Sequence, residues 1–248
     1  MLVYENNKKE FIKTINNLSG KYSAYDIFYD FITMYACSLQ NAVRYSEKRE
    51  EEYKQVVSKY TPKGVENLVS LGINVINALT DRFGDFLGEC FEALNLNDKK
   101  GKGQCFTPYH VGHMMAKTTF NKDMMEEQLK EKPYITVYDG CVGGGCLLIS
   151  AMDVIKELGY NFQTQSFVVA SDLDPRCVRM AYIQLALIGT PAIILCGDTL
   201  KMEYWEEWHT PMYVMNYHIF GKNPPELAEN TTLAKIATVE KTEQLTLL

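Results

Sequence analysis

The chain has 248 residues and 46% of them are hydrophobic, so it can bury a sizeable core in one medium domain or in one domain with a helical extension. Its net charge of −6 excludes tight binding to a polyanion by charge alone, unless its cations cluster or a partner supplies them. We find no early signal peptide and no apolar run long enough to cross a bilayer, so we expect a cytoplasmic protein without membrane contact.

Residues 1–98 are predicted to form an all-helical lobe. Its first 20 residues are polar and poorly patterned, so we expect a loosely held arm. From Ala24 onward apolar residues recur three and four apart behind a helix-capping Ser23, which predicts an amphipathic helix. Further helical stretches are expected after a break at Thr61-Pro62, over residues 65–79 and 83–94.

A polar loop over residues 95–103 separates this lobe from the rest and carries a small cluster of lysines at residues 99–102. His110 and His113 follow, three residues apart on a predicted helix. No Asp, Glu or Cys stands nearby in sequence at a spacing that completes a metal site, so we expect no metal there. The seven cysteines form no Cys-x-x-Cys pair, which favours reduced thiols over disulfides or zinc.

Residues 134–149 carry the clearest structural signal. A β-branched run from Ile135 stops at Asp139, passes through glycines and continues as an apolar stretch from Cys146, which predicts a strand, a glycine turn and a helix. Glycines let backbone N–H groups approach a ligand, and the positive end of the helix dipole points to the same place. The stretch predicts a nucleotide-type pocket, although alone it fits a purely structural turn equally well.

Two further apolar runs, residues 166–170 and 192–196, predict parallel strands that end in acids. Asp172 follows the first strand, where a carboxylate can accept hydrogen bonds from a ribose diol. Asp198 follows the second, where it can meet an adenine amino group. The stretches between the strands have helical length and end at glycines. The sequence therefore predicts a βαβαβ unit, with these two acids and Asp139 lining one crevice.

Five motifs over residues 81–200 resemble those of adenine-specific (N-6) DNA methyltransferases, and especially the modification subunits of type I restriction systems. They are Asp85-Phe86-Leu87-Gly88-Glu89, Gly103-Gln104-Cys105-Phe106-Thr107-Pro108, Asp139-Gly140-Cys141-Val142-Gly143-Gly144-Gly145, Asp172-Leu173-Asp174-Pro175 and Gly197-Asp198-Thr199-Leu200. Their joint occurrence in this order is more specific than any one motif. The resemblance implies an α/β fold: a Rossmann-like methyltransferase half sheet, mostly parallel with about four strands, behind the helical lobe.

The resemblance also implies S-adenosylmethionine as the cofactor. Thr107 and Pro108 would then lie near its methionine end, Asp172 on its ribose and Asp198 on its adenine. The remaining cofactor-binding candidates of the same motifs are Phe106, Asp139, Gly140, Gly143, Gly145, Leu173 and Thr199. A dinucleotide-binding oxidoreductase would lack the upstream Phe-Thr-Pro element.

The catalytic element of the family is an Asn or Asp, two prolines and an aromatic at the end of the fourth strand. The side-chain amide and a backbone carbonyl accept hydrogen bonds from the adenine amino group, and the aromatic stacks on the flipped base. One candidate is the apolar run 212–215, a predicted strand, followed by Asn216 and Tyr217 without prolines. The sequence does not decide between this candidate and a second one, which contains Asn223.

The second candidate is Asn223-Pro224-Pro225, in which Glu226 replaces the aromatic. A glutamate cannot stack on adenine, so transfer through Asn223 would lose about 1 to 3 kcal/mol of base stacking. A plain proline turn at the end of the domain is the alternative interpretation of this motif.

A full family domain continues for three more strands and has, or recruits, a target-recognition module. In this chain we expect three regions: the lobe at 1–98, a methyltransferase-like domain at 99–221 and a tail at 222–248. The open edge of the half sheet must be covered by the lobe, the tail or another chain, such as a specificity subunit.

The tail ends in Gln-Leu-Thr-Leu-Leu, which resembles the short peptide by which bacterial replication proteins dock on the DNA polymerase sliding clamp. Such a tail presents apolar anchors and an amide to a preformed groove. The contacting residues would be Gln244, Leu245, Leu247 and Leu248. A C-terminal helix that packs its leucines on the core is the alternative.

Three functions remain open from the sequence. The leading hypothesis is an adenine-specific DNA methyltransferase of phage or restriction-modification type, which binds DNA weakly alone because the chain is acidic. The rival is a catalytically inactive S-adenosylmethionine-binding module that acts through partners such as the clamp. The third is methylation of a protein amide, because an Asn-Pro-Pro element also serves that reaction in related enzymes.

Overall fold

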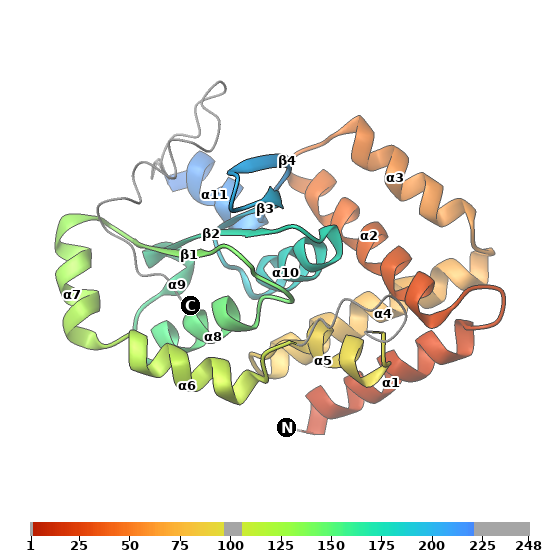
Figure 1. The fold of residues 1–248 in the computed structure, drawn as a ribbon, viewed down its shortest axis with the longest axis horizontal. Helices are drawn as coiled ribbons and strands as arrows, with labels where there is room; N and C mark the ends of the chain where they lie inside the picture. The colour runs from red at the N-terminus through yellow and green to blue at the C-terminus, as the bar shows by residue number, and fades with distance from the viewer. Residues whose placement is uncertain (1, 97–105, 221–248) are drawn as a thin grey trace.

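The computed structural model describes residues 2–96 and 106–220, with side chains as far as Asn216, and shows a helical half joined to a sheet (Figure 1). The helices of the first half are α1 (Leu2–Leu18), α2 (Ala24–Val43), α3 (Glu47–Ser58), α4 (Pro62–Asp81) and α5 (Phe86–Ala93). In the described residues, no helix is both long and apolar enough to cross a membrane.

The first 20 residues are not a loose arm, so that prediction was wrong. Residues 2–18 form α1, whose side chains Tyr4, Phe11 and Ile15 are fully buried. Phe11 makes edge-to-face contacts with Phe31 and Phe86, with ring centroids 5.4 and 5.6 Å apart. A few apolar residues on one face are therefore enough to anchor a helix whose remaining surface is polar.

Helix starts were predicted well because their caps are local. Ser23 forms a capping box with Asp26: the Asp26 N–H donates to Ser23 Oγ, and the Ser23 N–H donates to Asp26 Oδ2, both at 3.2 Å. At the predicted break, Thr61 Oγ1 accepts a 3.2 Å hydrogen bond from the Gly64 N–H, and Pro62 is the first helical residue of α4.

The sheet of the described residues has four strands in the order β1-β2-β3-β4. The first three are parallel and β4 is antiparallel to β3. The strands are β1 (Ile135–Asp139), β2 (Ser166–Asp172), β3 (Ala192–Asp198) and β4 (Glu203–His209). The helices of this half are α6 (Tyr109–Thr119), α7 (Lys122–Glu131), α8 (Cys146–Glu157), α9 (Phe162–Gln165), α10 (Pro175–Ile188) and α11 (Pro211–Phe220). The predicted βαβαβ unit is confirmed.

The two crossover helices lie on one face of the sheet. Parallel crossovers are right-handed, so a strand order that advances in one direction places successive helices on the same side. Side chains of α8 and α10 accordingly share one core with Val137, Val168 and Ile194. The opposite face, with Phe167 and Val169, forms a second cluster with Tyr213 of α11.

The fourth strand is not the apolar run 212–215, which was a wrong prediction. That run belongs to α11, which begins at Pro211, and the Thr210 carbonyl accepts a 3.2 Å hydrogen bond from the Val214 N–H. A four-residue apolar run does not distinguish strand from helix, and proline is favoured at a helix start. The actual strand β4 alternates exposed and half-buried side chains over its first five residues and ends in two buried ones.

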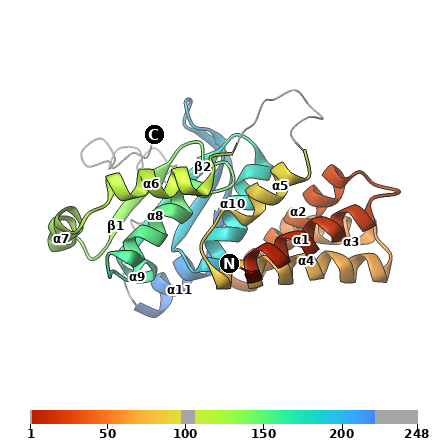
Figure 2. The ribbon, with the colours of Figure 1, turned by 90° about the horizontal axis from the view of Figure 1, so that it is seen from below.

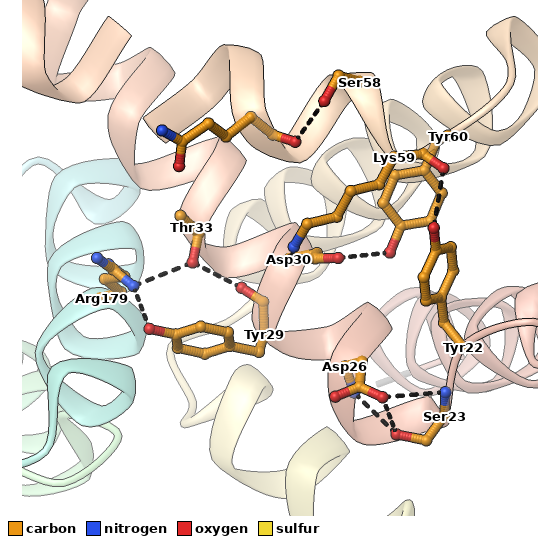
Figure 3. Close-up of polar contacts among 11 residues, drawn as sticks. Tyr22, Ser23, Asp26, Tyr29, Asp30, Thr33, Ser58, Lys59, Tyr60 and Arg179 are labelled. Carbon is orange, nitrogen blue, oxygen red and sulfur yellow. Dashed lines mark hydrogen bonds and ion pairs between the residues drawn. The ribbon is translucent and has the colours of Figure 1, made fainter. Parts of the chain in front are cut away.

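Helix α10 lies between the sheet and the helical lobe, and it packs against α2, α4 and α5 (Figure 2). Arg179 of α10 is 5% exposed and donates hydrogen bonds to Tyr29 Oη at 2.8 Å and Thr33 Oγ1 at 3.1 Å, both on α2 (Figure 3). Its other terminal nitrogen pairs with Glu52 Oε2 of α3 at 3.2 Å. Lobe and sheet thus share one continuous core.

The outer edge of β4 contacts the lobe directly. The His209 N–H donates to Gln40 Oε1 at 2.8 Å, and Arg49 donates to the Glu207 carbonyl. Arg44 Nη1 lies 2.8 Å from His209 Nδ1. Side chains of α2 and α3 therefore form hydrogen bonds with backbone groups of β4 that point away from β3.

Candidate functional site

The glycine turn follows the carboxyl end of β1, as predicted. Gly143 and Gly145 adopt φ values of +54° and +100°, which favour glycine. Gly145 is also the residue that precedes the first turn of α8. The Val142 N–H donates to the Ser171 carbonyl at 3.0 Å, so the turn is fixed to the end of β2.

Two carboxylates accept hydrogen bonds from backbone N–H groups of this turn. Asp139 Oδ1 accepts a 3.0 Å hydrogen bond from the Cys141 N–H, and Asp172 Oδ2 accepts one of 2.9 Å from the Gly143 N–H. Burial raises the pKa of Asp139 to about 6, and the neighbouring Asp172 charge adds to that rise. Burial also raises the pKa of Asp172. A ligand that donates hydrogen bonds here would offset the cost of keeping these carboxylates charged.

Thr199 joins the third strand end to the turn. Its hydroxyl donates to the Gly140 carbonyl at 2.8 Å and lies 2.9 Å from Ser171 Oγ. A Cβ on Gly140 would lie 3.0 Å from Thr199 Cγ2, so this close approach favours glycine. Gly140 and Thr199 therefore brace the ends of the three parallel strands.

The Asp198 carboxylate forms hydrogen bonds within the turn that follows β3. Its Oδ1 accepts hydrogen bonds of 3.1 Å from the N–H groups of both Leu200 and Lys201, and these donors hold its pKa below the usual value. Its Oδ2 lies 3.4 Å from Lys201 Nζ. A contact between this carboxylate and an adenine amino group stays a prediction.

The Phe-Thr-Pro element lies against the glycine turn. A Cβ on Gly143 would lie 3.4 Å from the ring of Phe106, which is buried. The Phe106 N–H donates to Glu92 Oε1 at 3.0 Å, and its ring makes an edge-to-face contact with Phe91 at 5.4 Å. The structure thus brings together motifs that are far apart in sequence. Three further candidates remain open to solvent: Thr107, Pro108 and Leu173.

Sequence analysis missed one residue behind the turn, Gln184 of α10, which is fully buried. Its Nε2 donates to the Gly144 carbonyl at 2.7 Å and to Asp85 Oδ1 at 2.8 Å. Its Oε1 accepts a 3.0 Å hydrogen bond from the Leu87 N–H. Burial raises the pKa of Asp85 to about 6. A glutamine within an amphipathic helix gives no sequence signal for this role.

The family comparison agrees with this geometry. The family model described as N-6 DNA methylase matches residues 78–245, which is more than half of the chain. The chain belongs to the N-6 DNA methylase family. This family implies S-adenosylmethionine as the cofactor. No curated protein matched the chain.

Two solved structures are similar to this chain. One is the type I restriction-modification system methyltransferase subunit from Streptococcus thermophilus, with TM-score 0.42 and 16% identity over 82% of this chain and 60% of that chain. The other is described as a class I S-adenosylmethionine-dependent methyltransferase from Listeria monocytogenes, with TM-score 0.37 and 14% identity over 71% of this chain and 54% of that one. This chain therefore spans little more than half the length of either protein.

Of the catalytic candidates, the structure describes the side chain of Asn216 alone, and it lies away from the glycine turn. Asn216 is 8% exposed on α11, and its Nδ2 donates to the Gln163 carbonyl at 2.8 Å. It lines a small pocket with Ser166 and Pro191, which lie at the amino ends of β2 and β3. The glycine turn lies at the carboxyl ends, about 20 Å away along a seven-residue strand. The remaining candidates lie outside the described side chains: Tyr217, Asn223, Pro224 and Pro225.

Sequence analysis found no acid at ligand spacing from the α6 histidines, but the structure brings two acids to one of them. His110 is exposed, but His113 lies beside Asp153 and Glu157 of α8. Ligands on a helix 40 residues away cannot be found from local spacing. This cluster is separate from the glycine turn and is treated below.

Proposed function

We propose that this chain binds S-adenosylmethionine in the crevice at the carboxyl ends of β1, β2 and β3, and methylates the amino group of adenine in DNA. The observation that carries the proposal is the position of Gly143, whose N–H donates to Asp172 at 2.9 Å and whose Cα faces the ring of Phe106. Three motifs of the N-6 DNA methylase family thereby form one wall.

The residues of this wall fit the cofactor. Asp172 has a raised pKa and remaining acceptor capacity for a ribose diol, while Gly143 and Gly145 keep the backbone free of Cβ atoms at the turn. S-adenosylmethionine supplies an electrophilic methyl group when bound. Asp139 holds the first strand end in place through the Cys141 N–H.

For the transfer itself we propose Asn223 rather than Asn216. Asn216 is buried near the amino ends of β2 and β3, opposite the glycine turn, and donates to the Gln163 carbonyl. Asn223-Pro224-Pro225 lies within the residues matched by the family, and its amide and backbone carbonyl would accept hydrogen bonds from the adenine amino group.

The cofactor site is tested by calorimetric titration of the wild-type chain, Asp172→Asn and Asp123→Asn with S-adenosylmethionine. Asp123 is exposed on α7 and provides a matched control. We expect binding to the wild type and the control, and a loss of at least tenfold in affinity for Asp172→Asn, because a charged acceptor is removed. Unchanged affinity in Asp172→Asn would overturn the site.

The reaction is tested by transfer of a labelled methyl group to unmethylated DNA. Asn223→Ala should abolish transfer with cofactor binding intact, and Asn216→Ala should retain it. Loss of transfer in a folded Asn216→Ala with a normal Asn223→Ala would reverse the assignment.

One observation favours the rival function, a cofactor-binding module without catalysis. Asn216 lies away from the crevice, and the remaining Asn-Pro-Pro motif has Glu226 where the family has an aromatic. Cofactor binding without methyl transfer to DNA, in the presence of a matching specificity subunit, would support this rival. Transfer to a protein amide instead would support the third possibility.

The partners and compartment follow from the same proposal. We propose a cytoplasmic enzyme that meets its target with the help of a specificity subunit, because a chain with net charge −6 holds DNA weakly alone. Docking of Gln244, Leu245, Leu247 and Leu248 on a sliding clamp stays a prediction, since these residues lie outside the described part of the chain.

A further inference from the structure

Three ligating side chains meet where α6 packs on α8. His113 of α6, Asp153 and Glu157 of α8 each offer one ligand atom, and these atoms lie within 4.8 Å of one another. Asp153 and Glu157 are four residues apart, so they share one face of α8. The helices approach closely at Gly112, where a Cβ would lie 2.9 Å from Ser150 Oγ.

The two separations that involve the imidazole nitrogen are close to those of ligands around one metal ion. His113 Nε2 lies 3.3 Å from Glu157 Oε1 and 3.6 Å from Asp153 Oδ2. Ligand atoms about 2.1 Å from a tetrahedral zinc ion are about 3.4 Å from each other. The two carboxylate oxygens also lie within 4.8 Å of each other, so all three groups can converge on a single cation.

Neighbouring contacts hold two of the ligands in orientation. The Tyr109 hydroxyl donates to Asp153 Oδ2 at 2.6 Å. Burial and this hydrogen bond raise the pKa of Tyr109 well above its usual value. The Tyr109 ring also stacks on His113, with centroids 5.9 Å apart and planes at 27°. Outer contacts of this kind are typical of the groups that support metal ligands.

The imidazole nitrogen that faces the two acids is shielded from solvent and makes no hydrogen bond within the described residues. Its 3.3 Å approach to Glu157 Oε1 makes no well-aligned hydrogen bond, and coordination would give this nitrogen a directed partner. The side chains of His113 and Asp153 are nevertheless 22% and 24% exposed, so an ion can enter from solvent. Lys117 Nζ lies 3.1 Å from Glu157 Oε2, the oxygen that faces away from the imidazole.

We propose that His113, Asp153 and Glu157 form a binding site for a divalent first-row transition metal ion of the Zn²⁺ class, which clamps α6 to α8. A neutral imidazole and two carboxylates balance the charge of such an ion and leave one position for water. An imidazole ligand disfavours Mg²⁺, which prefers oxygen ligands. Because α6 follows Pro108 directly and α8 follows Gly145, the clamp fixes the separation of two walls of the crevice.

The site is tested by titrating the full chain, with its thiols reduced, with Co²⁺ and then displacing that ion with Zn²⁺. Visible absorption reports on the ligands: a nitrogen and oxygen site gives weak d–d bands, whereas any of the seven cysteines would add an intense near-ultraviolet charge-transfer band. We expect one Co²⁺ per chain without that band, displaced by Zn²⁺ but not by Mg²⁺.

Variants decide whether the ion is at this cluster. His113→Ala should weaken Co²⁺ binding about 100-fold and remove the Zn²⁺-induced rise in melting temperature, while His110→Ala, on the exposed side of the same helix, should behave as wild type. Glu157→Gln provides a second test if His113→Ala does not fold. No Co²⁺ binding, a spectrum from thiolates alone, or binding unchanged in His113→Ala would overturn the proposal.

Discussion

The Gln184 side-chain amide donates a 2.7 Å hydrogen bond to the carbonyl of Gly144, and so connects the middle of α10 to the glycine turn. The same amide donates to Asp85 Oδ1 and accepts from the Leu87 N–H. Gln184→Met keeps the volume but leaves three buried polar groups without this partner. We expect a loss of about 3 kcal/mol or more in the free energy of unfolding, measured by urea denaturation.

The control for this prediction is Gln55→Met, because Gln55 is exposed on α3. Its free energy of unfolding should change by less than about 0.5 kcal/mol. If Gln184→Met unfolds at the same urea concentration as the control, the polar contacts behind the turn do not stabilise it. Affinity for S-adenosylmethionine, measured where both variants are folded, should fall only in Gln184→Met.

Gly145→Ala should disturb both stability and cofactor binding. At φ +100° an alanine is strained by about 1 to 2 kcal/mol, and its Cβ would lie 3.4 Å from Ala181 Cα. Gly159→Ala is the matched control, because Gly159 has φ +92° and open space around its Cβ position. Both variants should lose stability in thermal melts, but only Gly145→Ala should bind the cofactor more weakly. Equal cofactor affinities would contradict a binding role for the turn.

The affinity for S-adenosylmethionine should fall with decreasing pH near pH 6. Asp139 has a pKa raised to about 6 and the pKa of Asp172 is also raised, so both take up protons at a higher pH than ordinary aspartates. Protonation of Asp139 near pH 6 weakens the acceptor that holds the Cys141 N–H of the turn, and protonation of Asp172 removes a charged acceptor for the ribose. Calorimetry should therefore show full affinity at pH 8 and a decline through pH 6. A flat profile from pH 8 to pH 5 would argue against a carboxylate contact.

Arg179→Leu should weaken the attachment of the helical lobe. It removes the donor to Tyr29 and Thr33 and leaves Glu52 without its ion-pair partner. We expect a loss on the order of 3 kcal/mol in the free energy of unfolding. Arg179→Lys should recover only part of it, because an ammonium cannot reproduce the fork of a guanidinium. Lys63→Ala, which removes an exposed ion pair, should change it by less than about 1 kcal/mol.

Local signals in the sequence identified much of this fold. The strand, glycine turn and helix around Gly143 were predicted because each depends on neighbouring residues, and so was the start of α2 at Ser23. Helix α11 was predicted as a strand, because residues 212–215 are apolar in either state. The strand β4 was missed, since its charged residues resemble a loop and its place depends on pairing with β3.

The parts of the sites that sequence analysis missed come from distant chain segments. Gln184 reaches Gly144 across 40 positions, and His113 meets Asp153 only because α6 packs on α8. Motif resemblance indicated the glycine turn and its two acids, but not the side chains that hold them in place. Contacts of this kind depend on the packing of helices, which no local spacing encodes.

The contacts of the lobe with β4 also bear on solubility. An uncovered edge strand offers unpaired N–H and C=O groups that recruit strands of other molecules, and Gln40 and Arg49 occupy two such groups. The helical half therefore covers the β4 edge of the sheet, where another strand could otherwise pair. A truncated chain that keeps β1 to β4 but lacks α2 and α3 would expose this edge together with Trp208, which is fully buried in the intact molecule.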